Sequence, residues 1–188
     1  MEAKVFIDEK IQIVKELIQE VETNFKGLNQ NELNWKETSE KWSINECLEH
    51  LNSYSRYYLP EYEKTTNSGT KASIYEYKSK WFGRKCVQSV DPANMSKKKL
   101  KSPKHHNHCN SNINKDTVSE FIHHQNKLID ILEQAKSINI NKAKVKIEIM
   151  KLIKLTLGNM FNFFVTHEQR HIIQAKNVLA LAKNDNDC

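Results

Sequence analysis

The stretch MFNFFVTHEQRHIIQAKNV, residues 160–178, is the part of the chain that decides its fold class. Residues of one stripe recur there in steps of three or four, which is the spacing of one face of an α-helix. The stripe consists of Met160, Phe164, His167, His171, Gln174 and Val178. The stretch therefore predicts a helix, over about residues 156–182, whose inner face carries two histidines and a glutamine among core residues.

Two earlier segments show the same helical spacing of apolar residues. The first predicts a helix over about residues 3–25. In the second, Ser43 and Glu46 have the S-x-x-E spacing of a capping box, which predicts the start of a helix over about residues 43–65. Pro60 predicts a bend in that helix or the approach to its end, because proline has no backbone N–H to donate.

The second half of the chain begins with a long irregular connection. Residues 67–114 lack a sustained periodicity, so they predict a long loop with one short helix around Trp81. Thr117 and Glu120 then repeat the capping-box spacing, which predicts a third helix over about residues 116–136.

Four helices joined in this way predict the fold class. Residues 142–155 are apolar at mixed spacing and add a short extra helix before the last one. The short links make each pair of helices antiparallel, whereas the long connection crosses the bundle from end to end. The prediction is a single all-α domain over residues 1–188, a four-helix bundle of up-down-down-up topology with a long crossover between helices 2 and 3.

Composition and charge indicate in which compartment the protein is expected and which partners it is expected to have. The formal charge is +6, from 29 Lys and Arg against 23 Asp and Glu. The four cysteines show no C-x-x-C spacing, and the first residues lack the apolar core of a signal peptide. No apolar run of about 18 residues predicts a membrane span. We therefore expect a soluble cytoplasmic protein with reduced thiols and no membrane partner.

The two histidines on the last helix predict a metal site. Imidazoles four residues apart project from one helix face, so His167 and His171 can hold one ion. His50 is the only histidine on the inner side of another predicted helix, and three imidazoles with an open position are a recurring catalytic arrangement for zinc and related ions. The alternative is a pair of core histidines hydrogen-bonded to neighbouring helices. Gln174 either orients a bound water or substrate or makes an ordinary helix-to-helix hydrogen bond.

His167–His171 also spells H-E-x-x-H, the zinc motif of many metallopeptidases. A metzincin would need glycine at position 174 and histidine at position 177, where this chain has Gln174 and Asn177. No Glu or His follows His171 as a third ligand, and no edge strand is evident to align a peptide. The peptidase interpretation is therefore rejected, and Glu168 is expected to be incidental, as a salt-bridging residue or a support for the ligands.

The chain resembles the DinB/YfiT-like superfamily in two places. One is W-S-x-x-E-x-L-x-H-L at residues 42–51, and the other is H-x-x-x-H-x-x-Q at residues 167–174. The resemblance implies an up-down-down-up four-helix bundle with a divalent metal, commonly nickel or zinc, held by three histidines that map onto His50, His167 and His171. Implied activities are metal-dependent transfer of low-molecular-weight thiols, such as bacillithiol S-transfer and mycothiol-dependent isomerisation. Many members are labelled metal-dependent hydrolases without a known substrate.

A divalent ion lowers the pKa of a coordinated thiol or water and so supplies a nucleophile at neutral pH. Cys47 lies in the core stripe of the second helix and is expected to be inert, so a thiol would come from a cosubstrate. Glu46, one turn before His50, is a candidate base, although its capping role is sufficient to explain it.

A second group of histidines and a basic run lie in and near the long loop. The group is His105, His106, His108 and Cys109, with His123 and His124 nearby. It resembles a metal cluster, but a solvated loop is the favoured interpretation. The basic run is Lys97, Lys98, Lys99, Lys101 and Lys104. It could contact nucleic acid with Trp81 and Phe82 stacking on bases, or attract an anionic cosubstrate, or be solvated.

The leading hypothesis is a metal-dependent thiol S-transferase or hydrolase acting on a small molecule. The alternatives are a noncatalytic metal-bound bundle with a binding or stress role and, less favoured, a nucleic-acid-binding protein that uses the basic loop. A homodimer is kept as a candidate assembly.

Overall fold

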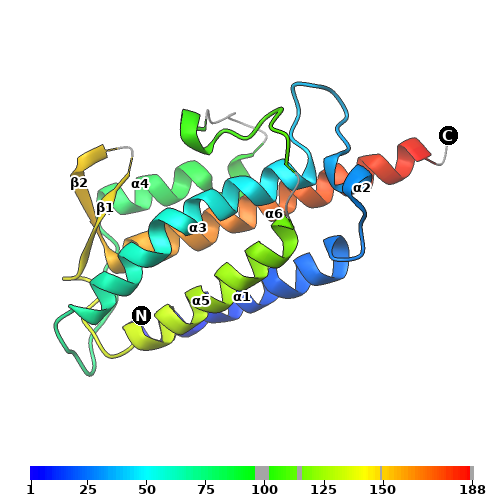
Figure 1. Ribbon diagram of the computed structural model, residues 1–188. Coiled ribbons are helices and arrows are strands. Elements are labelled where there is room, and N and C mark those ends of the chain that lie inside the picture. Colours follow the sequence, from blue (N-terminus) through cyan, green and yellow to red (C-terminus); the bar gives the residue numbers. More distant parts are fainter. Residues whose placement is uncertain (96–101, 114–115, 149, 187–188) are drawn as a thin grey trace.

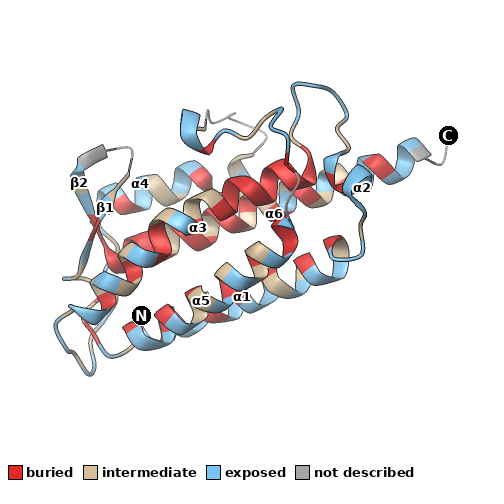
Figure 2. Cartoon of the chain, viewed as in Figure 1, coloured by how far each residue is buried: buried red, intermediate tan, exposed pale blue. Residues whose placement is uncertain are grey.

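The computed structural model describes residues 1–95, 102–113, 116–148 and 150–186. Four long helices lie alongside one another in it (Figure 1). They are α1 (Ala3–Phe25), α3 (Ile44–Asn67), α5 (Thr117–Ala135) and α6 (Leu157–Asn186). Both α1 and α3 contact α5 and α6, and Figure 2 shows the buried residues gathered on the sides that face one another. The fold is therefore mostly helical, as the sequence predicts.

The starts of α3 and α5 show how local sequence sets the helix ends. The Oγ of Ser43 accepts a hydrogen bond from the backbone N–H of Glu46 at 3.1 Å, and the Glu46 carboxylate accepts one from the N–H of Ser43 at 2.9 Å. This is the predicted capping box. At α5, however, the capping side chain is Asp116, which accepts from the N–H of Ser119 at 2.9 Å. The capping box predicted from Thr117 is therefore wrong by one residue.

Pro60 does not end α3, which continues to Asn67. Proline removes one backbone hydrogen bond, and here the helix is held on both sides of that position by packing. Leu59 and Tyr62 are 2% and 0% exposed within the core that α1, α5 and α6 share. Tertiary contacts thus outweigh the local cost of the proline.

Residues 142–155 form part of a β-hairpin, and the predicted extra helix is wrong. Strand β1 (Lys144–Ile147) pairs antiparallel with β2 (Met150–Thr156), with Val145 opposite Leu155. The run Lys-Val-Lys-Ile alternates polar and apolar residues, which is the period of a strand. Val145 and Leu155 are both buried in the core. The all-α class is therefore corrected to a mostly helical fold with a two-stranded sheet.

The long connection contributes elements that cover the bundle. In it, α4 (Trp81–Val90) packs along α6, which confirms the short helix predicted around Trp81. Two 3₁₀ turns follow, η1 (Pro92–Asn94) and η2 (Lys104–His106). A further short helix, α2 (Gln30–Asn34), lies outside this connection, in the link between α1 and α3. Of the predicted basic run, Lys97, Lys98, Lys99 and Lys101 lie outside the described residues. Within the described part of the chain, none of the helices is both long and apolar enough to cross a bilayer.

Candidate metal centre

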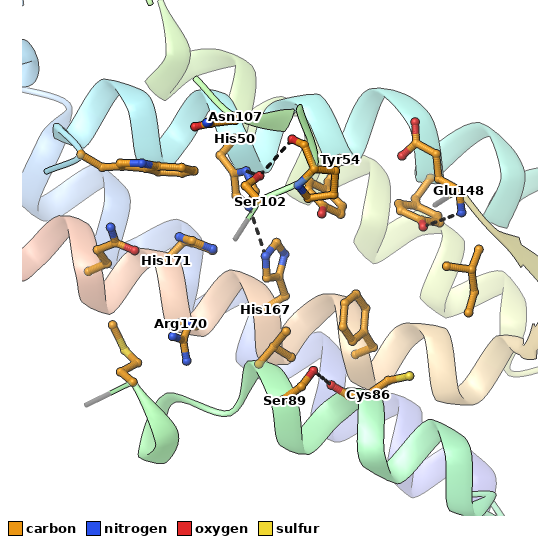
Figure 3. Close-up of a pocket in the computed structure, with 18 of the residues that line it drawn as sticks. His50, Tyr54, Cys86, Ser89, Ser102, Asn107, Glu148, His167, Arg170 and His171 are labelled. Atoms are coloured by element: carbon orange, nitrogen blue, oxygen red, sulfur yellow. Dashed lines mark hydrogen bonds between the residues drawn. The ribbon is translucent and has the colours of Figure 1, made fainter. Parts of the chain in front are cut away.

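Three histidines from two helices converge beside a cavity (Figure 3). His50 comes from α3, and His167 and His171 come from successive turns of α6. Their ring centroids lie 4.5–5.0 Å apart in each pair. One nitrogen from each ring can be chosen so that the three atoms lie within 4.8 Å of one another. The structure therefore brings together the three residues that the sequence predicts.

The backbone of the long connection sets the tautomer of His50. The Nδ1 of His50 lies 2.7 Å from the backbone carbonyl oxygen of His106. A carbonyl can only accept, so this contact requires a proton on Nδ1. In the neutral ring, the Nε2 of His50 then carries a lone pair that points at the other histidines. A hydrogen bond of this kind is the usual support of a metal-binding histidine.

The spacing of the nitrogens fits a divalent ion. The Nε2 atoms of His50 and His167 lie 3.2 Å apart. Two nitrogens that bind one tetrahedral zinc ion at about 2.0–2.1 Å are about 3.3 Å from each other. Within the described part of the chain, the buried Nδ1 atoms of His167 and His171 have no hydrogen-bond partner. The protein by itself thus leaves these rings incompletely satisfied.

The electrostatics of the centre keep all three rings neutral. Burial lowers the pKa of His50 and of His167, and repulsion from His171 lowers both further. Burial and then the positive charge of Arg170 lower the pKa of His171 to about 4, while a hydrogen bond with Gln174 opposes this shift. Neutral imidazole is the form that binds a metal, so the centre does not have to lose protons at neutral pH before it binds an ion.

Aromatic rings hold the three imidazoles in place. Trp42 stacks on His171 at a centroid distance of 5.8 Å and meets His50 edge-on at 5.0 Å. The ring centroid of Tyr54 lies 4.9 Å from those of both His50 and His167. The sequence places Trp42 at the helix start and Tyr54 on the core stripe, but it does not show that they surround the histidines.

The centre opens into a cavity of about 840 Å³. Apolar side chains from several segments form much of its wall: Trp42, Tyr54, Tyr58, Phe82, Val90, Met95, Pro103, Ile147, Leu155, Met160 and Phe163. The polar side chains of the wall include Arg170 and Gln174, which lie on α6 with two of the histidines. This volume and this combination of apolar wall and few polar groups are typical of sites for small molecules.

The two predicted catalytic candidates lie in different places. Gln174 lines the cavity and lies about one turn after His171 on α6. Glu46 instead lines a separate, smaller pocket. Its carboxylate accepts hydrogen bonds from Ser43, from the Lys36 ammonium at 3.0 Å and from the backbone N–H of Asn110. The structure therefore brings Gln174, but not Glu46, to the wall of the cavity that contains the histidines.

Glu168 occupies a different side of α6 from the two histidines. Its Oε1 accepts a hydrogen bond from the side chain of Gln125 on α5 at 2.7 Å, and the residue is 1% exposed. Burial raises the pKa of Glu168 to about 8, against the effect of the Gln125 hydrogen bond. The glutamate of the H-E-x-x-H motif is thus a buried, protonated core residue at neutral pH and does not line the cavity.

Two residues outside the predicted site, His106 and Glu148, lie next to it. His106 is 3% exposed, contrary to the solvated loop expected for its segment, and its ring stacks on Tyr54 at 3.8 Å. Glu148 follows β1 and lines the cavity at its hairpin end (Figure 3). Neither residue has a periodic neighbour in the sequence, because each lies in a turn. No signal in the chain could have paired them.

Comparisons with known proteins agree with this architecture. A sequence model of the DinB superfamily matches residues 14–175. Among solved structures, YfiT from Bacillus subtilis is similar to 92% of this chain over 85% of its own, with a TM-score of 0.57 and 14% sequence identity. It is described as a "probable metal-dependent hydrolase with an unusual four-helix bundle topology". At this identity the likeness shows a common fold alone. No match was found among curated proteins.

Proposed function

Because the chain belongs to the DinB superfamily, we propose that it is a metal-dependent enzyme that acts on a small molecule. The observation that carries the proposal is the convergence of His50, His167 and His171 on the wall of a cavity large enough for such a substrate. The three histidines would hold one divalent ion, nickel or zinc. The description of YfiT as a probable metal-dependent hydrolase supports the same class of chemistry.

The bound ion would lower the pKa of a water or thiol at its open position, for hydrolysis or for thiol S-transfer. The side chains of this protein would then orient the reactants. Gln174 lines the cavity together with His171, so it can direct a substrate or nucleophile. Arg170 adds a positive charge to the wall, and the apolar side chains exclude water from the rest of the substrate.

We propose that a thiol would come from a cosubstrate, because neither Cys47 nor Cys86 is suited to supply it. Cys47 is fully buried, and burial raises the pKa of its thiol well above the ordinary range. Cys86 lines the cavity, but burial raises its pKa as well. Neither environment stabilises a thiolate. A low-molecular-weight thiol is therefore the thiol partner that we propose, with a substrate whose body is apolar.

The proposal extends to the arrangement of the chain. We propose one domain with helices in up-down-down-up order, which the colour gradient of Figure 1 supports: α3 and α5 run in one direction, and α1 and α6 run in the other. We also propose a homodimer as a candidate assembly.

Nothing in the described residues favours nucleic acid as a partner over a small molecule.

Elemental analysis of untagged protein tests the metal site. Wild-type protein should contain one equivalent of nickel or zinc more than a His171→Ala variant. A His123→Ala variant, changed at an exposed position on α5, should match wild type. The loop histidines also attract metal, so the comparison is made after dialysis against a weak chelator. Equal metal content in wild type and His171→Ala would refute the site.

Turnover by the metal-loaded protein tests the enzyme. The assay uses a panel of small thiols with apolar electrophiles, and a panel of esters and amides without thiol. We expect turnover in one panel by wild type and by His123→Ala, and none by His171→Ala. Metal binding without turnover in either panel, together with binding of a defined partner protein, would instead support the noncatalytic bundle.

A further inference from the structure

Beyond the three-histidine centre, we propose that His105, His106 and Glu148 form a second site for a divalent transition-metal ion such as zinc. The three residues come from two segments that are far apart in the chain. His105 and His106 belong to the turn η2 of the long connection, and Glu148 follows strand β1 of the hairpin. One ligand atom from each residue can be chosen so that the three atoms lie within 4.8 Å of one another.

The carboxylate of Glu148 faces both imidazoles. Its Oε1 lies 3.1 Å from the Nε2 of His105, and its Oε2 lies 2.7 Å from the Nε2 of His106. Donor atoms around a tetrahedral zinc ion are about 3.3 Å apart, so the ligands would have to open by roughly half an ångström. The 2.7 Å contact with the buried His106 needs most of this change, so the Glu148 carboxylate is the group that would have to move.

Hydrogen bonds fix which nitrogen of His106 faces the carboxylate. The Ser53 hydroxyl donates its proton to the backbone carbonyl of His50 at 2.7 Å. Its oxygen then accepts from the Nδ1 of His106, which lies 2.8 Å away. The neutral ring is left with a lone pair on Nε2, directed at a carboxylate oxygen. Two lone pairs at this distance require a cation between them, which either a proton or a metal ion supplies.

The support of the ligands is typical of a built metal site. His106 is 3% exposed and is held by Ser53 and by its stack on Tyr54. The backbone N–H of Glu148 donates to the Tyr58 hydroxyl at 3.1 Å, which fixes the turn that carries the carboxylate. Hydrogen bonds to ligands and their backbone hold such sites in position. The exposure of His105 leaves the site open to solvent, so an ion can enter.

The ligand set selects the class of ion. Two imidazoles and one carboxylate suit zinc, nickel or cobalt, whereas calcium and magnesium prefer oxygen ligands throughout. An ion here would join the long connection to the hairpin at the edge of the cavity that Glu148 lines. It would lie apart from the first centre, because the rings of His50 and His106 are 6.3 Å apart, and its ligands share no residue with the three-histidine set.

Zinc titration of untagged, metal-free protein, with elemental analysis after gel filtration, tests the proposal. Wild type should bind two equivalents. Glu148→Gln, which removes the charge and keeps the shape, and His105→Ala, at a half-exposed position, should each lose one equivalent. His171→Ala should lose the other equivalent and keep this one, while His123→Ala should keep both. Circular dichroism of each variant verifies that it is folded.

The outcomes separate this proposal from the three-histidine centre. One equivalent that disappears in His171→Ala and persists in Glu148→Gln would overturn the second site and leave the first intact. One equivalent that disappears in Glu148→Gln and persists in His171→Ala would do the reverse. Cobalt substitution tests whether a thiol is a ligand. If a thiolate-to-cobalt absorption band and the second equivalent both disappeared in Cys109→Ser, the ion would be bound by a cysteine and the proposal would be overturned.

Discussion

The Nδ1 of His50 lies 2.7 Å from the backbone carbonyl oxygen of His106, so a residue of the long connection sets the proton position of a residue in the bundle. The contact joins η2 to α3. Side-chain contacts of His106 with Ser53 and Tyr54 hold that carbonyl in place. The long connection is thus part of the candidate metal centre and does more than link two helix pairs.

Loss of the His106 side chain should weaken metal binding by the three histidines without removing a ligand. In His106→Ala the carbonyl remains, but the contacts that position it are lost. We expect the affinity to fall by about 10–100-fold, as for other losses of support behind a metal ligand. Competition with a chelator measures it. Glu148→Gln keeps the Ser53 and Tyr54 contacts and is the matched control. Equal affinity in His106→Ala and wild type would show that the carbonyl does not depend on the ring.

Glu168→Gln should keep the metal and change how stability depends on pH. The pKa of Glu168 is raised to about 8 in the folded protein, above its ordinary value near 4.5. The folded state therefore binds the extra proton between these values, and wild type should lose stability as pH rises from 5 to 8, by at most about 1.4 kcal/mol per pH unit. The variant should not show this contribution. Urea unfolding of both metal-free proteins at several pH values measures the difference in their free energies of unfolding. The histidines titrate in both proteins, so their contribution cancels in this difference. If Glu168→Gln lost the metal, or if its stability changed with pH as in wild type, the buried neutral carboxyl would be contradicted.

Gly83→Ala should destabilise the contact between α4 and α6. A Cβ atom at Gly83 would overlap the side chain of Asn159, which is 1% exposed and accepts a hydrogen bond from Tyr77 at 2.8 Å. We expect a loss of about 1–3 kcal/mol in the free energy of unfolding, because the buried Asn159 side chain cannot move away from the added Cβ without losing packing. Gly27→Ala meets no atom within 4 Å and is the control. Chemical denaturation measures both, and equal stability of the two variants would contradict the close approach.

Cys86→Trp should block the cavity without changing the metal. Cys86 lies on α4 in the cavity wall, and a tryptophan there would occupy space that the substrate needs. We expect at least a tenfold loss in kcat/KM and unchanged metal content, with Cys86→Ser close to wild type. Steady-state kinetics on whichever substrate the panels identify provides the measurement. A Cys86→Trp protein that retains full turnover would place the substrate elsewhere.

Much of the helical architecture could be predicted because it is encoded locally. The three- and four-residue spacing of apolar side chains identifies α1 and α6, and the Ser43 capping box sets the start of α3. The hairpin is also encoded, in the alternation of Lys and apolar residues from Lys144, but the run is too short to separate a strand from mixed spacing. The run forms a strand because this conformation buries the Val145 side chain in the core.

By itself, the sequence determined that His167 and His171 lie on one helix face, because four residues make about one helical turn. It also indicated that His50 lies on the inner face of another predicted helix. Only the tertiary structure decided that the three rings meet, that Glu168 points to Gln125, and that His106 and Glu148 lie face to face. The physical reason is that helical periodicity is set by neighbours in the chain, whereas contacts between a turn, a hairpin and a bundle depend on how separate segments pack.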